Sequence, residues 1–232
     1  MEVKGSVALV TGANRGIGLA FTRALLARGA AKVYAGVRDP ESVREPGVET
    51  LRLDVTDEDQ IAAAAVAASD ATIVINNAGI QAGPSLLEGS LEGARRELEV
   101  NYLGTWAVSR AFAPVLAAGG GGALVNMLSV ASWRVSKRWP SYAASKAAEW
   151  SVTNALRVGL RPQGTLVVGV HVGFVDTDAT VGLDVPKVPA AEVAAQTMDA
   201  ISRDVPEVLV DEVSRQVRAA LSGPVELLDP AP

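Results

Sequence analysis

The chain has 232 residues, of which 49% are hydrophobic and 20% charged, and its formal net charge is −5. It is too apolar for a disordered chain, and its acidity gives no support for binding nucleic acid or an anionic membrane. With no cysteine and a single histidine, His171, the sequence excludes disulfide scaffolds, thiolate catalysis, cysteine-ligated zinc and His-cluster metal sites, so we expect no metal.

Short apolar segments rich in Val, Ile and Leu alternate with longer segments of helical periodicity along the whole chain. Strands buried on both faces of a parallel sheet have such unbroken apolar runs. We therefore predict an α/β fold: one doubly wound domain over residues 1–232, with about seven mostly parallel strands and helices on both faces. In chain order, the expected strands are 7–10, 32–37, 50–53, 71–75, 123–127, 165–170 and 207–210, and the expected helices are 17–28, 58–68, 91–116, 142–160, 190–203 and 211–221.

A glycine-rich turn connects the first predicted strand to the first predicted helix. Residues 11–18 read Thr-Gly-Ala-Asn-Arg-Gly-Ile-Gly. Gly12 allows a sharp exit from the strand, Gly16 allows close approach to a pyrophosphate, and Gly18 allows tight packing of helix on sheet. A glycine-rich turn without a ligand is the alternative, but the strand–turn–helix context favours dinucleotide binding. No Lys-Ser/Thr pair follows, which disfavours a P-loop nucleotidase.

The end of the second strand indicates which dinucleotide binds. NAD-binding sites usually place an acidic residue there, to accept hydrogen bonds from the adenosine ribose. Val37 occupies that position, Arg38 follows it, and Arg15 lies in the glycine turn. Two guanidinium groups suit a 2′-phosphate, although Asp39 could pair with Arg38. We expect NADP(H) rather than NAD(H); two solvated arginines are the alternative.

Further motifs follow in a recognisable order. They are Asp54-Val55, the Asn76-Asn77-Ala78-Gly79 turn, Asn101, Ser129, and a Tyr142-x-x-x-Lys146 pair. With the glycine turn, this set resembles the short-chain dehydrogenase/reductase family, in its single-domain, NADP-preferring branch that is similar to carbonyl reductases. The resemblance covers the chain from Val7 to about Val210 and implies a Rossmann fold.

The resemblance implies roles for individual residues. Ser129, Tyr142 and Lys146 would be the catalytic trio, and Asn101 would hold a water in the proton relay. Ser129 is preferred to Ser132 because it lies at the family's usual separation from Tyr142. The glycine-turn reasoning and the resemblance together predict these cofactor-binding residues: Gly12, Asn14, Arg15, Gly16, Ile17, Gly18, Arg38, Asp54, Val55, Asn77, Ala78, Gly79, Tyr142, Lys146, Gly173, Val175 and Thr177.

One position departs from the family pattern. After the sixth strand the family commonly has Pro-Gly followed by Thr, whereas here Val172 precedes Gly173 and Thr177. The missing proline removes a backbone constraint and adds an N–H group, so cofactor affinity could be lower.

Tyr142 and Lys146 lie four residues apart on a predicted helix and therefore share a face. A free tyrosine has a pKa of about 10, and bringing the phenol near neutrality requires about 4 kcal/mol of differential stabilisation. A neighbouring ammonium in a partly dry cleft supplies an effect of this order. Ser129 would donate a hydrogen bond to the substrate oxygen where negative charge develops, while Tyr142 acts as general acid or base.

For each of the remaining notable residues, a purely structural role is an alternative to a functional one. We expect His171 at a strand end or core edge rather than as a catalytic base, and Trp150 in helix packing. Trp133 and Trp139 either line an apolar substrate site or pack within their loop. The basic residues Arg134, Lys137 and Arg138 more plausibly form a solvated face than a site for an anionic substrate.

Residues 177–189 would form a short substrate lid and residues 223–232 a flexible tail. No segment has the roughly 20 apolar residues of a membrane span, and we see no signal or lipidation motif, so we expect a cytoplasmic protein. The predicted function is NADPH-dependent reduction of an aldehyde or ketone, in a homodimer or homotetramer by family analogy. The alternatives are an NAD-linked alcohol dehydrogenase working oxidatively and a catalytically dormant NADP-binding regulatory protein.

Overall fold

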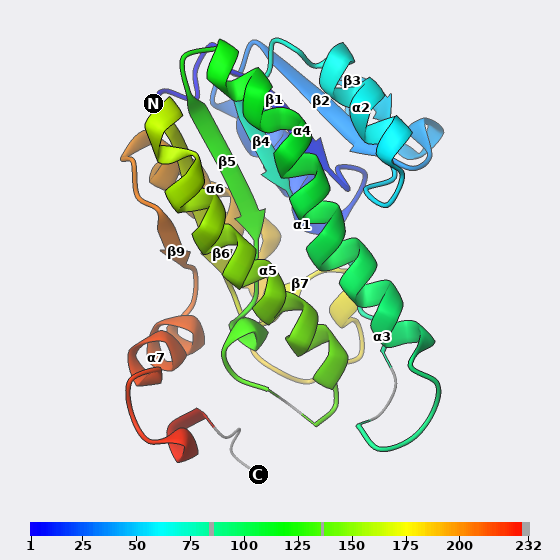
Figure 1. The fold of residues 1–232 in the computed structure, drawn as a ribbon, viewed down its shortest axis with the longest axis vertical. Helices are drawn as coiled ribbons and strands as arrows, with labels where there is room; N and C mark the ends of the chain where they lie inside the picture. The colour runs from blue at the N-terminus through cyan, green and yellow to red at the C-terminus, as the bar shows by residue number, and fades with distance from the viewer. Residues whose placement is uncertain (84–85, 136, 229–232) are drawn as a thin grey trace.

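A computed structural model of the chain describes residues 1–83, 86–135 and 137–228 (Figure 1). Seven parallel strands form one sheet in the order β3-β2-β1-β4-β5-β6-β9, which confirms the predicted doubly wound α/β fold. A short two-stranded ribbon, β7-β8, stands apart from it and was not expected. The strands are β1 Val7–Thr11, β2 Lys32–Val37, β3 Glu49–Arg52, β4 Ile73–Asn76, β5 Gly122–Met127, β6 Thr165–His171, β7 Val175–Asp176, β8 Val188–Pro189 and β9 Glu207–Leu209.

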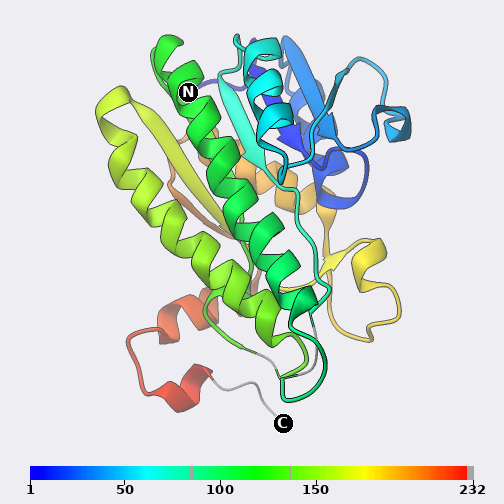
Figure 2. The ribbon, with the colours of Figure 1, turned by 45° about the vertical axis from the view of Figure 1, so that its right-hand side comes forward.

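Helices cover both faces of the sheet, so its central strands are almost wholly buried. On one face, Phe21 of α1 and Met198 of α6 pack with alternate strand residues. On the other, Phe112 of α4 contributes to a second core cluster, and Figure 2 shows α4 beside α5 on that face. The helices are α1 Gly16–Ala27, α2 Glu58–Ala67, α3 Glu92–Glu97, α4 Thr105–Ala118, α5 Pro140–Gly159, α6 Ala190–Ser202 and α7 Glu212–Ala220.

The predicted single helix over residues 91–116 is wrong in detail. A π-helical segment, Leu98–Gly104, separates α3 from α4, and it contains Asn101. A π-turn inserts an extra residue into the helical ladder, and such turns occur frequently at functional sites. Gly104 packs there so closely on Val55 that an added Cβ would lie 2.8 Å from its side chain. Hydrophobic periodicity does not register one inserted residue, because the flanking turns keep the helical pattern.

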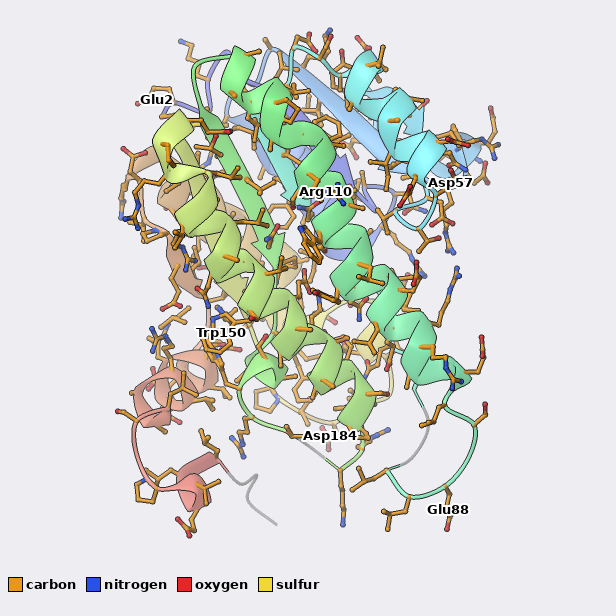
Figure 3. All side chains as sticks on the ribbon, viewed as in Figure 1. Glu2, Asp57, Glu88, Arg110, Trp150 and Asp184 are labelled. Carbon is orange, nitrogen blue, oxygen red and sulfur yellow. The ribbon has the colours of Figure 1, made fainter. Side chains whose placement is uncertain are left out.

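The strand order reverses direction between β1 and β4. In doubly wound sheets, ligands bind beyond the carboxyl ends of the strands at such a switch point. The loops after β1, β4, β5 and β6 therefore converge on one crevice, at the end of the molecule where α5 begins; Asp184, in the segment 177–189, lies at the same end (Figure 3).

Two further expectations concern the C-terminal tail and membrane-spanning helices. In the expected tail, Val225–Leu228 forms a short 3-10 turn, and residues 229–232 lie outside the described residues. Within the described part of the chain, no helix is both long enough and apolar enough to cross a bilayer.

Candidate active site

The glycine turn between β1 and α1 has the geometry that the sequence predicts. Gly12 and Gly16 have φ values of +67° and +55°, in the left-handed region that favours glycine. An added Cβ at Gly18 would lie 2.1 Å from the carbonyl oxygen of Gly12, so only glycine lets α1 start this close to the strand. The turn leaves a concave backbone surface at the N-terminus of α1, which suits a pyrophosphate.

Thr11 joins the two strands that border the switch point. Its hydroxyl oxygen accepts hydrogen bonds from the backbone N–H groups of Asn77, at 2.9 Å, and Ala78, at 3.0 Å. The side-chain amide of Asn77 in turn donates to the carbonyl oxygen of Thr11 at 2.9 Å. These reciprocal bonds set the width of the crevice between the two loops.

A cavity of about 640 Å³ extends from the glycine turn across the end of β2. Arg15 and Arg38, the two predicted phosphate ligands, both line it. The carboxylate of Asp39 accepts the backbone N–H of Glu41 at 3.1 Å and so begins the turn that follows β2. The Arg15 and Arg38 guanidinium groups thus border the end of this cavity, where Asp39 also lies.

Asp54 lines the same cavity. Burial raises the pKa of its carboxyl, but two hydrogen bonds from Thr56, with the charges of Arg38 and Arg96, lower the pKa more strongly, so that it lies below its ordinary value. Asp54 is therefore an ionised hydrogen-bond acceptor at neutral pH, as an exocyclic amino group requires.

A second cavity, of about 490 Å³, adjoins the first and shares lining residues with it, among them Ile17, Asn77 and Thr177. Ser129, Tyr142 and Lys146 all line this second cavity. Ser129 lies at the end of β5 and accepts the backbone N–H of Ala131 at 3.1 Å. Ser132 is buried, does not line the cavity, and its hydroxyl has no hydrogen-bond partner in the described residues. The geometry thus favours Ser129 over Ser132.

Lys146 is buried, with 5% of its surface exposed. Its ammonium donates to the carbonyl oxygen of Met127 at 2.8 Å and to the carboxylate of Glu149 at 2.6 Å. Burial lowers the pKa of Lys146, but the attraction of Glu149 and Tyr142 outweighs it and raises the pKa above its usual value. Lys146 is therefore a cation at neutral pH. Glu149 was not singled out from the sequence.

Asn101 lies fully buried in the π-helical segment. Its side chain pairs with the backbone of Ile80, accepting its N–H at 2.8 Å and donating to its carbonyl oxygen at 2.9 Å. A further bond of 2.9 Å connects it to the hydroxyl of Ser145 on α5. Asn101 thus ties the loop after β4 to the helix that carries Tyr142 and Lys146.

The loop after β6 closes the other wall of the second cavity. The backbone N–H of Gly173 donates to the carboxylate of Asp211 at 2.8 Å, and the same carboxylate caps α7 through Ser214. This tie constrains the loop where the family pattern has a proline and this chain has Val172. Thr177 lines both cavities, and Val175 lines the second.

The aromatic residues separate into packing and lining roles. Trp133 is buried, stacks on His171 with ring centroids 3.7 Å apart, and meets Trp150 of α5 edge-on. Trp150 is labelled on α5 in Figure 3. Burial lowers the pKa of His171 to about 3, so it is neutral and unsuited to act as a base. Trp139 lines the second cavity and contacts Phe174. The structure therefore places Trp139, but not Trp133, at the cavity.

Of the basic residues in that loop, Arg134 lines the second cavity. Arg138 lies over the Trp139 ring, 4.9 Å from its centroid. The predicted solvated face is therefore only partly right, because Arg134 borders the cavity.

The structure describes all of the predicted site residues. Among them, only Gly18 and Asn101 line neither cavity.

Comparison with known proteins agrees with this architecture. The family model for short chain dehydrogenases matches residues 6–186, which include the glycine turn and the Tyr142–Lys146 pair. The chain belongs to the short-chain dehydrogenase/reductase family. Its members include dehydrogenases that act on CH–OH groups, so the chain is an oxidoreductase of this type.

Individual proteins are similar to this chain over most of their length. The structure of a short-chain dehydrogenase from Burkholderia cenocepacia J2315 in complex with NADP is similar to this one, with 38% sequence identity and a TM-score of 0.93. The match covers 98% of this chain and 97% of the Burkholderia chain. Cis-4-hydroxycyclohexanecarboxylate dehydrogenase of Sinomonas cyclohexanicum is 33% identical over 85% of this chain and 84% of its own. D-erythrulose reductase of Gallus gallus is 36% identical over 77% and 74%, respectively.

Some residues of this short-chain dehydrogenase site escaped the sequence reasoning. Glu149 and Asp211 hold a predicted functional residue or its loop but carry no motif of their own. A signal existed for Glu149, because a glutamate three residues after Lys146 lies on the same helix face. Several other missed lining residues are apolar, and no pattern distinguishes them from core: Leu128, Val135, Phe174, Leu183 and Val213. The polar lining residues Gln81, Ser42 and Arg96 were also missed.

Proposed function

We propose that the protein is an NADPH-dependent carbonyl reductase, in which Tyr142 supplies a proton to the substrate oxygen. The observation that carries this proposal is the joining of two cavities. One runs along the glycine turn and the two arginines, and the other contains Ser129, Tyr142 and Lys146. A dinucleotide that lies in the first would present its reactive ring to the second.

The residues present fit NADP(H). The glycine turn leaves room for a pyrophosphate, and Arg15 and Arg38 suit a 2′-phosphate because Val37 replaces the acid that NAD sites usually carry. Similarity to the Burkholderia cenocepacia protein crystallised with NADP supports this choice. Asp54 would accept from the adenine amino group. When bound, the cofactor supplies or accepts the hydride.

The chain's own residues would handle the proton and the developing charge. The Ser129 hydroxyl donates a hydrogen bond to the substrate oxygen, which becomes more negative as hydride arrives. The Tyr142 phenol donates its proton to that oxygen in reduction and accepts it in oxidation. Lys146 keeps a positive charge beside the phenol and has a donor left for the nicotinamide ribose, because an ammonium has three N–H groups and only two are used within the protein.

The shape and lining of the second cavity favour an apolar substrate. Trp139, Phe174 and Leu183 provide hydrophobic walls, and Arg134 adds one cation at the rim. The dehydrogenase from Sinomonas cyclohexanicum acts on a hydroxycyclohexane carboxylate. A cyclic or branched ketone that carries a carboxylate would suit this combination, and residues 177–189 would act as the lid over it.

The direct test compares cofactors and a Tyr142→Phe variant. Purified protein should bind NADPH more tightly than NADH and oxidise NADPH in the presence of cyclic ketones. Tyr142→Phe should abolish turnover while leaving the NADPH dissociation constant near the wild-type value. An equally active Tyr142→Phe variant would exclude the mechanism. Tighter binding of NADH, with faster alcohol oxidation, would favour the NAD-linked dehydrogenase instead.

We further propose that the protein works as a homo-oligomer. Leu98, Leu103 and Trp106 are each about two-fifths exposed along the outer side of the π-helical segment and α4. Exposed apolar residues of this size on neighbouring turns are common in subunit interfaces. Sedimentation equilibrium of the wild type against Trp106→Glu tests it: the variant should dissociate, and a monomeric wild type would refute it.

A further inference from the structure

Glu149 places a buried carboxylate directly on the lysine of the active site. Only 1% of its surface is exposed, and its Oε2 lies 2.6 Å from Nζ of Lys146, three residues earlier on α5. The Thr105 hydroxyl at the start of α4 donates to the other carboxylate oxygen at 3.2 Å. Burying two charges is costly, and such a pair is often no more stable than well-packed apolar residues. Its presence at this position therefore suggests a role other than stability.

The carboxylate determines where the lysine points. The Met127 carbonyl at the end of β5 and the Glu149 carboxylate take two of the three N–H groups of the ammonium. A Cβ added to Gly79 would lie 3.8 Å from Nζ of Lys146. Because Gly79 belongs to the turn that borders the cofactor crevice, the ammonium lies beside that turn. With two donors held by the protein, the third remains for the cavity that Lys146 lines.

The charge of Glu149 also acts on protons nearby. A negative charge close to an ammonium makes it hold its proton more tightly, and Lys146 also interacts electrostatically with Tyr142, so the ammonium and the phenol exchange protons as a coupled pair. Neutralising Glu149 therefore lowers the pH at which the Tyr142–Lys146 pair releases its first proton, whichever of the two groups loses it. Burial raises the pKa of Glu149, while the Lys146 charge and the hydrogen bonds from Lys146 and Thr105 oppose that rise.

Few other ionisable groups face this pair in the described residues. His171 on β6 interacts electrostatically with Lys146 but is neutral because burial lowers its pKa. Glu97 of α3, which packs on α5, is buried and accepts the amides of Ala82 and Gly83. Neither supplies a second counter-charge to Lys146.

We propose that Glu149 is a positioning residue that aims Lys146 into the active site and, through its negative charge, sets the pH range over which the Tyr142–Lys146 pair keeps its proton. This inference rests on the proposed role of Tyr142, and it adds a residue to which the family resemblance assigns no role.

The test is a titration of the Tyr142 phenol that needs no substrate. The chain has three tyrosines, so the ultraviolet phenolate signal of Tyr142 is obtained by subtracting the Tyr142→Phe titration in the same background. Glu149→Gln keeps the shape and an acceptor oxygen but removes the charge. We expect the alkaline limb of kcat for carbonyl reduction to fall by about one pH unit or more, with KM little changed. The phenol midpoint should fall by the same amount if Tyr142 loses the first proton and should rise if Lys146 loses it, so that in either case it moves.

Three further variants separate charge from packing. Glu149→Ala removes the same charge and should give the same shift, which keeps the test valid if Glu149→Gln does not fold. Glu149→Asp retains the charge and should stay near the wild-type midpoint. Thr153→Val is the matched control: Thr153 is equally buried on α5 and bonds the backbone carbonyl of Glu149 but not its carboxylate. It should lower thermal stability without moving the midpoint.

An unchanged midpoint in Glu149→Gln and Glu149→Ala, with only a lower unfolding temperature, would overturn the inference and leave Glu149 a packing residue. That outcome is distinct from failure of the proposed function, which would appear as a wild type without carbonyl reduction, or as an active Tyr142→Phe variant, while the phenol titration stayed readable.

Discussion

Replacing Thr11 by valine tests whether the hydroxyl between β1 and β4 holds the cofactor crevice in shape. Valine is close to threonine in size, so the change removes an acceptor and leaves the packing nearly intact. Thr11 is 1% exposed; its hydroxyl oxygen accepts two backbone N–H groups, from Asn77 and Ala78, and donates a longer bond of 3.4 Å to the carbonyl oxygen of Ile75. At about 1 kcal/mol for each of the two shorter bonds, we expect the free energy of unfolding to fall by about 2 kcal/mol. For a chain of this size, that corresponds to a fall of roughly 4–8 °C in the unfolding midpoint.

The assay combines urea unfolding, thermal unfolding and NADPH titration followed by nucleotide fluorescence. Thr11→Val should raise the NADPH dissociation constant as well as lower stability, because the loops it joins line the crevice. Thr11→Ser keeps the acceptor and is the matched control, with near wild-type affinity. Equal losses in the serine and valine variants would show that keeping the hydroxyl does not preserve the crevice, and our reasoning would be refuted.

Three further predictions follow from the same geometry. Gly18→Ala would place a methyl carbon 2.1 Å from a backbone oxygen and should destroy NADPH binding. Gly159→Ala is its control: apart from adjacent residues and the backbone of its own helix, the added methyl group would have no neighbour within 4 Å among the described residues, so the variant should fold normally and its free energy of unfolding in urea should rise by up to about 1 kcal/mol. Asp211→Asn keeps the helix cap but loses an acceptor for the Gly173 N–H, so the NADPH dissociation constant should rise several-fold without loss of α7; unchanged affinity would contradict the tie. The pKa of His171 is lowered to about 3, so its contribution to folding is present above the unfolded value of about 6.5 and is lost as pH falls below it. The free energy of unfolding should therefore drop by up to about 1.4 kcal/mol per pH unit below about pH 6, and His171→Phe should flatten that slope; parallel slopes would refute it.

The predicted central strands were located correctly because a parallel sheet covered on both faces needs unbroken apolar segments, and β4 and β5 are buried along almost their full length. The helix over residues 91–116 was only partly right. The π-helical segment that carries Asn101 depends on contacts with the loop after β4 and with Ser145 of α5, which lie far away in the sequence. Local periodicity contains no information about such contacts.

The roles of the aromatic residues likewise depend on contacts that local sequence does not contain. Trp133 and Trp139 flank the same loop, and both packing and lining were expected for either. Only the fold separates them, because Trp133 meets His171 at the end of β6 while Trp139 faces Phe174. Arg134 likewise borders the cavity, although its loop had the composition of a solvated face.

By itself, the sequence determined the order of strands and helices, the glycine turn at the first strand, and the Tyr142–Lys146 pair on one helix face. These features depend on residues close together in the chain, where spacing and backbone preference decide the geometry. The tertiary structure alone decided which distant hydrogen-bond donors the carboxylates of Glu149 and Asp211 meet. Glu149 and Thr105 come from different helices, and Gly173 and Asp211 lie 38 residues apart. A carboxylate's effect on a proton depends on distance through space and on the exclusion of water, and both arise only when the helices close on the sheet.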